Sequence, residues 1–230
     1  MNKSSHELKQ KTMAPDPRLC FDPTVLRLKE YLRSFFLRPT VHVAHHLIGA
    51  WLARYYKGAW YGAQIVETEA YLGSIDAAAH SWRGRRTPRV EPMYCLGGHL
   101  YVFFVYGMHH CANIVTRKEG TAEAVLLRAA AGPPGTPTRL MSGPGRLCSA
   151  MGITTSSSGV DLLAGGDLRL FRCRGPKPPI GITPRIGIDY AGEAKHWPLR
   201  FYNENSSAVS GPPSLRARSR SHRGNKGAIT

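Results

Sequence analysis

The sequence predicts an α+β fold in which most strands run antiparallel and helices are few. Segments with a strand pattern outnumber segments with helical spacing along the 230-residue chain. They do not alternate with helices in the rhythm of parallel βαβ units. Two apolar segments, 99–106 and 110–116, are separated by a short turn that contains Gly107, as expected for an antiparallel hairpin.

The chain divides into an apolar-rich middle and two polar ends. Residues 1–33 are polar and contain three prolines, and we expect a flexible arm with at most a short helix at 26–31. Residues 213–230 carry five Lys or Arg side chains and no acid, which predicts a disordered basic tail that contacts DNA nonspecifically. Residues 34–212 are long enough to bury a sizeable core and are expected to form one domain.

The elements of this middle part follow from side-chain periodicity. Residues 40–55 carry apolar side chains mostly at helical spacing and predict a helix that runs into a strand. Gly58 marks a turn, and Gly107 with Met108 suits the centre of a type II′ hairpin turn. Residues 80–92 predict a loop. Further strands are expected at 60–71, 99–106, 110–116, 122–131, 167–173 and 180–187, and a short helix at 146–151.

The charge of the chain indicates its partner. The 31 Lys and Arg residues outnumber the 15 Asp and Glu residues, which gives a formal net charge of +16. Such a field attracts polyanions, with nucleic acid as the leading partner and an anionic membrane surface as the second. The loop at 80–92 carries four arginines against Glu91, so phosphate contact is an alternative to an ordinary solvated surface.

Several classes of protein are excluded. The apolar runs are too short to span a membrane, and the first residues lack the apolar core of a secretory signal. The cysteines are scattered, odd in number and without a CxxC pair, which argues against a disulfide framework and a structural zinc site. We expect reduced thiols in an intracellular compartment. The five cysteines are Cys20, Cys95, Cys111, Cys148 and Cys173.

Two acids lie in an apolar strand pattern. Alternation places Glu67 and Glu69 on one face and Val66, Thr68 and Ala70 on the other. A solvated strand face explains this pattern, and the stretch alone favours that explanation. The functional alternative is that one carboxylate is a general base acting on water.

One arginine lies in the apolar strand at 122–131. A buried guanidinium is costly unless it is paired, so Arg128 needs a carboxylate such as Glu69, or a phosphate. The alternative is that Arg128 reaches solvent along its stem near a strand end. The residues alone leave both interpretations open.

The hairpin at 99–116 is apolar or aromatic on both faces. One face can enter the core, while the other needs a cover such as a flat nucleobase. Tyr106 lies beside the turn, where it could protrude as a wedge between base pairs. Periodicity alone favours a fully buried central hairpin instead.

Four side chains suggest a metal site, namely His80, His109, His110 and Cys111, and a metal-dependent hydrolase would use three of them, His80, His109 and Cys111. Adjacent strand residues point to opposite faces, so His109 and His110 should not share an ion, and the sequence has no HExxH pattern. We therefore expect no metal and no other cofactor.

Several ungapped segments resemble the alkyladenine DNA glycosylase family, also called methylpurine or 3-methyladenine DNA glycosylases. The similarity spans most of residues 33–210. The resemblance implies a single domain built on a curved, mostly antiparallel β-sheet with a protruding β-hairpin and flanking helices. The matching segments are 33–40, 65–73 (IVETEAYLG), 76–89 (DAAAHSWRGRRTPR), 100–114 (LYVFFVYGMHHCANI), 125–129 (VLLRA), 143–153 (GPGRLCSAMGI) and 184–202 (PRIGIDYAGEAKHWPLRFY).

The resemblance also implies roles for individual residues. Glu69 matches the general base that activates water, Arg128 the arginine that helps to hold this water, and Val209 a residue whose carbonyl contacts it. Tyr106 matches the residue that intercalates into the gap left by a flipped nucleotide. The implied base pocket consists of Tyr71, His80, Phe103 and Asn113, of which Asn113 disfavours the exocyclic amine of guanine.

The family resemblance predicts a monofunctional glycosylase that removes alkylated or deaminated purines from double-stranded DNA in base excision repair. We expect a monomer without cofactors, located with DNA in a nucleus or a bacterial cytoplasm. Residues 132–142 are shorter and richer in Pro and Gly than in the family. A catalytically silent DNA-binding protein and a metal-dependent hydrolase are the alternatives, and the intact Glu69, Arg128 and Tyr106 favour the enzyme.

Overall fold

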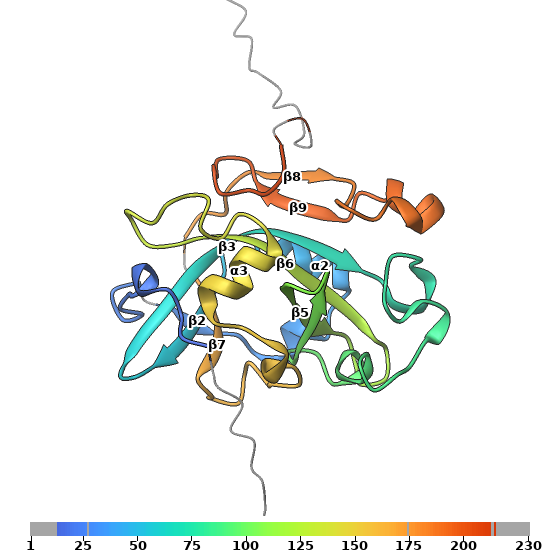
Figure 1. The fold of residues 1–230 in the computed structure, drawn as a ribbon, viewed down its shortest axis with the longest axis horizontal. Helices are drawn as coiled ribbons and strands as arrows, with labels where there is room; N and C mark the ends of the chain where they lie inside the picture. Colours follow the sequence, from blue (N-terminus) through green and yellow to red (C-terminus); the bar gives the residue numbers. More distant parts are fainter. Residues whose placement is uncertain (1–12, 27, 174, 213, 215–230) are drawn as a thin grey trace, which may run out of the picture.

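The computed structural model describes residues 13–26, 28–173, 175–212 and 214. Among these residues, nine strands form one curved sheet whose pairs are all antiparallel (Figure 1), which confirms the α+β prediction. The order is β1-β7-β2-β3-β6-β5-β4, with β9 on β3 and β8 on β9. The strands are β1 (Lys29–Glu30), β2 (Trp51–Tyr56), β3 (Ala59–Tyr71), β4 (Leu100–Val105), β5 (His109–Thr116), β6 (Glu123–Ala131), β7 (Leu168–Arg172), β8 (Ile180–Thr183) and β9 (Arg200–Asn203).

The helices are short. The predicted helix running into a strand is confirmed, because α2 ends at His46 and β2 begins at Trp51. The helix α3 begins with Pro144, whose missing N–H suits a first helical turn, and ends at Gly152, which adopts φ 64°. The α-helices are α1 (Arg33–Phe36), α2 (Thr40–His46) and α3 (Pro144–Met151), and the 3-10 helices are η1 (Pro17–Leu19), η2 (Gly73–Ile75), η3 (Trp82–Gly84), η4 (Glu91–Tyr94), η5 (Thr155–Ser157) and η6 (Asp189–His196).

The sheet has two different faces. The main core cluster covers one face and includes residues of both α2 and α3 together with alternate residues of β3 to β6. Leu100 and Val102 of β4 belong to this cluster, whereas Tyr101 and Phe103 point to the opposite face. Periodicity alone favours a fully buried hairpin, and this expectation is wrong. The second face of the hairpin lines a cavity.

A β-bulge interrupts the pairing of β3 with β6. Ile65 lies opposite Ala130 and Glu67 opposite Ala129, so Val66 is the extra residue. The bulge changes the alternation predicted for this strand. Val66 packs with Tyr202 in a separate cluster rather than with Ala70 in the main core. Strict alternation was thus wrong for Val66.

The turn of the hairpin differs from the expected type II′ geometry. Tyr106 and Gly107 both have positive φ, 53° and 67°, and the Met108 N–H bonds the carbonyl of Val105 at 3.3 Å. Positive φ at both central residues is the pattern of a type I′ turn, which matches the twist of the strands. The predicted turn was therefore displaced by one residue.

The N-terminal part of the chain differs from its prediction in two respects. Lys29 and Glu30 pair with β7 as a strand, so the short helix at 26–31 was wrong. Leu19 is fully buried in the main core, within the segment expected to be a flexible arm. Residues 1–12 and, apart from Ser214, the basic tail at 213–230 lie outside the described residues. In the part of the chain that is described, no helix is long and apolar enough to cross a membrane.

Candidate active site

Glu69 lies where β3 runs between β6 and β9. Its side chain is fully buried, so the solvated strand face suggested by the sequence was wrong. The Tyr71 hydroxyl donates to Oε2 at 2.9 Å, and the Ile186 backbone N–H donates to Oε1 at 2.8 Å. Nη1 of Arg128 lies 3.2 Å from Oε1. These contacts compensate for the removal of a carboxylate from water.

Arg128 joins the two acids of β3. Its Nε lies 3.2 Å from Oε1 of Glu67, and the Ser210 hydroxyl accepts from its Nη2 at 3.2 Å. Glu67 is fully buried too, and Arg200 of β9 donates to its Oε1 at 2.6 Å. Two carboxylates and two guanidinium groups therefore form one charge-balanced cluster. Of the two interpretations that the sequence left open for Arg128, the structure shows the paired one.

The electrostatics of this cluster keep its donors protonated. Burial, followed by the negative charge of Glu69, raises the pKa of Tyr71 well above its ordinary value. Burial opposes the charged form of Arg128, but Glu69 and Glu67 outweigh it and raise the pKa of this guanidinium. Both groups therefore remain hydrogen-bond donors to Glu69 at neutral pH.

A buried ion pair holds the loop that contacts Glu69. Arg185 donates to Asp76 through Nη1 at 2.5 Å and Nη2 at 2.9 Å, and both side chains are fully buried. The guanidinium also lies 4.7 Å from the centre of the Tyr71 ring. Ile186 follows Arg185 directly, so this bidentate pair fixes the backbone N–H that bonds Glu69.

A cavity of about 320 Å³ opens beside the cluster. Tyr71, Arg128 and Ile186 belong to its wall, whereas Glu69 lies directly behind them. The hairpin, the loop after β3, β6 and the segment 186–190 supply most of the rest. The implied pocket residues Tyr71, His80, Phe103 and Asn113 all line this cavity, as do Tyr101, Tyr106, Cys111, Leu126 and Tyr190.

Aromatic rings form one side of the cavity. The rings of His80 and Phe103 meet edge to face at 4.5 Å, and Tyr101 lies 5.6 Å from Phe103. Nδ1 of His80 and the Tyr101 hydroxyl share a hydrogen bond of 2.8 Å. Burial, then Arg89 and Arg85, lowers the pKa of His80, so its ring is neutral at pH 7. Such a wall suits stacking by a flat, electron-poor group.

Asn113 supplies a polar group to the same wall. Its Nδ2 donates to the Tyr101 carbonyl at 3.1 Å, and only 5% of the residue is exposed. Because both residues belong to one register pair of β4 and β5, the hairpin itself fixes the amide. The thiol of Cys111 lies nearby, and burial raises its pKa to about 11.

Tyr106 stands at the tip of the hairpin. It is 83% exposed and adopts a left-handed backbone conformation that is unusual for a residue with a side chain. The neighbouring Met108 is 68% exposed. Strained residues persist where the surrounding structure holds them, often at functional sites. An exposed aromatic ring at the mouth of an aromatic cavity has the placement expected of a wedge.

Val209 lies near the charged cluster rather than in the cavity wall. It is 2% exposed, and its carbonyl accepts a hydrogen bond from the Ser142 hydroxyl at 3.3 Å. The next residue, Ser210, contacts both Glu67 and Arg128. The structure thus brings Val209 beside the site, with its carbonyl already accepting one bond.

The three side chains of the metal hypothesis do not gather. Within the described residues, no group of three or more His, Cys, Asp or Glu side chains could hold a metal ion. Cys111 and His80 line the cavity, but His109 turns toward α3. A Cβ at Gly145 would lie 2.9 Å from the His109 ring, so this position requires glycine.

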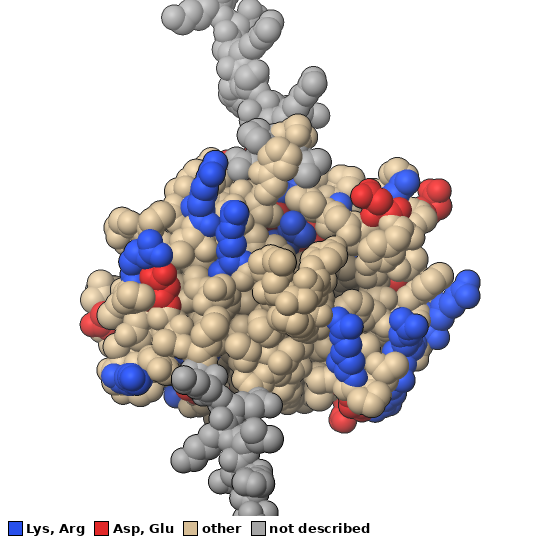
Figure 2. Space-filling view, viewed as in Figure 1, with Lys and Arg blue, Asp and Glu red and all other residues tan. Residues whose placement is uncertain are grey.

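A basic surface borders the cavity. The segment from 82 to 89 is exposed and contains Arg83, Arg85, Arg86 and Arg89. The loops between β3 and β4 lie at the right in Figure 1. Figure 2, in the same view, shows Lys and Arg side chains gathered over them. Arg86 pairs with Glu91, while Arg89 donates to the Phe104 carbonyl at 3.0 Å. The loop therefore carries positive charge to the edge of the pocket.

Sequence reasoning missed the partners that hold the cluster. Arg200 lies in a four-residue strand that was not predicted, and Ser210 follows an irregular turn. Ile186 contributes only a backbone N–H, which no side-chain pattern reveals. The signal available for Arg200 was a second arginine in an apolar stretch, which needs a partner as Arg128 does.

Comparison with known proteins adds a second line of evidence. The family described as methylpurine-DNA glycosylase (MPG) matches residues 34–207. Three relatives carry the name "Putative 3-methyladenine DNA glycosylase". The one from Desulfitobacterium hafniense is 44% identical over 202 residues, covering 80% of this chain and 99% of the relative. The relative from Alkaliphilus oremlandii is 41% identical, covering 77% of this chain and 97% of the relative. The relative from Methanocella arvoryzae is 42% identical, covering 77% of this chain and 94% of the relative.

Proposed function

The chain belongs to the methylpurine-DNA glycosylase family, and from this premise we propose that it hydrolyses the N-glycosidic bond of damaged purines in DNA. The proposed substrates are alkylated or deaminated purines in double-stranded DNA, including 3-methyladenine, 7-methylguanine, hypoxanthine and ethenoadenine. The product is an abasic site with an intact strand. The protein acts as a monomer in base excision repair, located with the DNA of a nucleus or a bacterial cytoplasm.

The observation that carries this proposal is the buried carboxylate of Glu69 behind an aromatic cavity. Three hydrogen-bonding directions of this carboxylate are occupied, two at Oε1 and one at Oε2. A carboxylate offers about four such directions, so Oε2 retains one for a water molecule. A water there would lie next to Tyr71 and Arg128, which belong to the cavity wall.

The reaction follows from this arrangement. The base is first extruded from the duplex, since its bond to deoxyribose is unreachable inside the stack. The bond from C1′ to the purine nitrogen breaks, its electron pair leaves with the base, and oxocarbenium character develops on the sugar. Water then bonds C1′ through its oxygen, and its proton passes to Glu69. The negative charge of Glu69 stabilises the sugar cation as it forms.

The cavity wall selects the base. An alkylated purine is electron-poor, so it stacks against the rings of Phe103, His80 and Tyr71. Neutral His80 retains one ring nitrogen beyond its bond to Tyr101 for an edge contact. Asn113, fixed by the hairpin, disfavours the exocyclic amine of guanine. Tyr106 fills the gap left in the duplex, as apolar wedges do in other DNA-bending proteins.

Arg128 and Val209 complete the proposed site. Arg128 orients the water through the carboxylate that it pairs with, and Val209, which lies beside the cluster, contacts this water through its backbone carbonyl. No lysine occupies the motif segments around Glu69 and Arg128 as an amine nucleophile. The reaction therefore ends at hydrolysis without strand cleavage.

The test is base release from a duplex that contains one hypoxanthine or one ethenoadenine, in the presence of EDTA. We expect release by the native protein and by Glu119→Gln, an exposed carboxylate control, but not by Glu69→Gln. Abasic sites are revealed by alkaline cleavage. Tight binding to the lesion without release by the native protein, also with 3-methyladenine, would instead identify a catalytically silent binder.

A further inference from the structure

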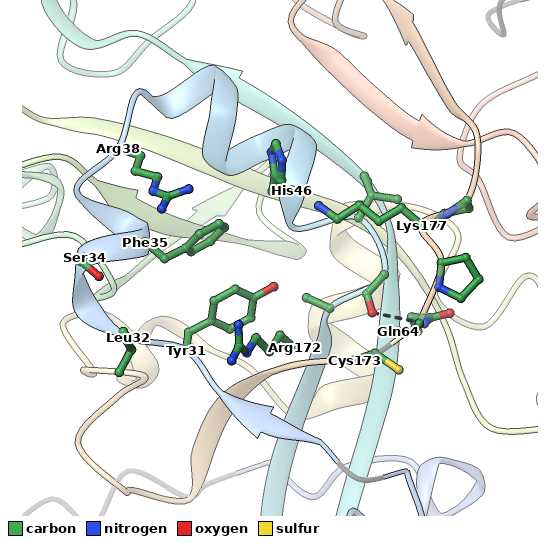
Figure 3. A pocket seen from close by; sticks show the side chains of 16 residues that line it. Tyr31, Leu32, Ser34, Phe35, Arg38, His46, Gln64, Arg172, Cys173 and Lys177 are labelled. Carbon is green, nitrogen blue, oxygen red and sulfur yellow. Dashed lines mark hydrogen bonds between the residues drawn. The ribbon is translucent and has the colours of Figure 1, made fainter.

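A second pocket lies apart from the candidate active site, between α1 and α2 and the segment that joins β7 to β8 (Figure 3). Its volume is about 420 Å³, and it shares no lining residue with the cavity beside Glu69. The helix α2 packs on the core face of β3, where the Thr68 hydroxyl donates to the Ala44 carbonyl at 2.9 Å. Glu69 projects from the other face. The two sites are thus separate.

The lining of this pocket carries positive charge without a counter-charge. It contains the cations Arg38, Arg172 and Lys177 together with His46, and none of the described residues that line it is an Asp or a Glu. Figure 3 shows Arg38, His46 and Lys177 on different sides of one space, with the Tyr31 hydroxyl pointing into it. Cations that surround an empty space without acids form a field that favours an anion.

Several other arginines have acidic partners. Arg33 pairs with Asp161 at 2.5 Å and Arg54 with Asp167 at 3.4 Å. Arg172 and Lys177 form no salt bridge with any described residue, and Arg38 donates to His42 Nε2 at 3.1 Å, not to a carboxylate. Their charges are therefore available to a ligand.

The pKa values of titratable groups near the pocket are shifted in the direction that positive charge and burial produce. Burial, then the charges of His46 and Lys177, lowers the pKa of His45. Burial, then His46, Arg38 and Lys177, lowers the pKa of His42. Burial alone lowers the pKa of Lys177. Among the described residues, no carboxylate contributes to the shifts of these three groups, so an anion bound in the pocket would relieve the repulsion.

We propose that this pocket binds the phosphate group of a small molecule, either inorganic phosphate or a nucleoside monophosphate. Phosphate oxygens accept charge-assisted hydrogen bonds from guanidinium and ammonium groups, which Arg38, Arg172 and Lys177 supply. The Tyr31 hydroxyl is a further donor, because no described residue bonds it and burial raises its pKa to about 12. The rings of Tyr31 and Phe35 pack at 4.6 Å and form an apolar wall beside the phosphate site. This inference is independent of the proposed glycosylase activity.

The test compares two double variants of equal charge. Arg172→Ala/Lys177→Ala removes one arginine and one lysine from the pocket, and Lys118→Ala/Arg139→Ala removes one of each from exposed positions elsewhere. Calorimetric titration of the full chain with inorganic phosphate and with AMP should give saturable binding. We expect the pocket variant to lose roughly tenfold or more in affinity and the control to lose little.

The two ligands distinguish the source of the phosphate. Tighter binding of AMP than of inorganic phosphate identifies a nucleotide that also uses the wall of Tyr31 and Phe35, and equal affinities identify the phosphate alone. No saturable binding of either at millimolar concentration, or equal losses in both double variants, would overturn the proposal. A lower DNA affinity of the pocket variant than of the control would also contradict it, because the pocket would then contact the DNA backbone.

Discussion

Nη1 of Arg128 lies 3.2 Å from Oε1 of Glu69, and the two side chains come from paired strands of one sheet. The same guanidinium contacts Glu67 through Nε, so one arginine bridges both acids of β3. Because Glu69 is fully buried, Arg128, Tyr71 and the Ile186 N–H replace the contacts with water that its carboxyl group has lost. Stability and proposed catalysis are therefore coupled at this contact.

Removal of Arg128 should cost both stability and activity. In Arg128→Ala, the buried carboxyl group of Glu69 loses its ionic partner, which lowers the free energy of unfolding by about 3–5 kcal/mol. Base release should fall to background. Urea unfolding and single-turnover assays measure the two effects. The control is Arg146→Ala, because Arg146 is exposed and donates to the Ser142 carbonyl. Adding Glu69→Gln to Arg128→Ala should restore part of the stability, whereas simple additivity would contradict the pairing.

Loss of the Tyr71 hydroxyl should affect catalysis more than folding. Tyr71→Phe keeps the ring in the cavity wall but removes the donor to Glu69 Oε2. The single-turnover rate should fall roughly tenfold and the free energy of unfolding by about 1 kcal/mol. Tyr55→Phe, on an exposed part of β2, should change neither. A Tyr71→Phe rate within twofold of the native rate would contradict the role of this bond.

The tip of the hairpin allows a matched comparison. Tyr106→Ala should weaken binding to a lesion-containing duplex roughly tenfold more than binding to undamaged DNA, because stacking of the wedge is lost. Met108→Ala, two residues away and also exposed, should weaken both equally and slightly. Fluorescence anisotropy with the two duplexes measures these ratios. Equal losses on both duplexes for Tyr106→Ala would remove the intercalation role.

The basic loop should determine part of the salt dependence. The affinity of the native chain for DNA should fall steeply as salt rises, because bound phosphates release counterions. Arg83→Ala/Arg85→Ala removes two exposed charges at the edge of the cavity and should reduce the slope of log K against log salt by about 2. The pocket variant Arg172→Ala/Lys177→Ala has the same net charge and should keep the native slope. A flat native salt dependence would contradict the charge argument.

His80 should make the folded state sensitive to mild acid. Its pKa is lowered in the folded protein by burial and then by Arg89 and Arg85, so below its ordinary value of 6.5 the unfolded chain binds a proton that the folded chain does not. The contribution of neutral His80 to the free energy of unfolding is therefore complete above about pH 6.5. It is lost as the pH falls toward the lowered pKa of the folded state. His80→Gln should show a smaller loss of unfolding free energy between pH 7 and pH 5. A loss as large as that of the native protein would contradict this assignment.

The sequence by itself determined the alternation of elements and the residues that carry the family resemblance. Periodicity located α2 and β2 and the hairpin, because these patterns depend on local burial of one face. The apolar strand around Arg128 raised an ionic partner as one of two interpretations, because desolvation of a lone charge is costly. These inferences need only local geometry and the cost of burial.

The tertiary structure alone decided how the two acids of β3 differ. A bulge at Val66 breaks strict alternation, and contacts from β9 and the segment after β8 bury both carboxylates instead of exposing them. Arg200, Ser210 and Ile186 reach Glu67 and Glu69 across more than a hundred residues of chain. Local sequence patterns do not reveal such partners. The free energy that holds these residues against Glu67 and Glu69 arises only when distant strands pair and exclude water.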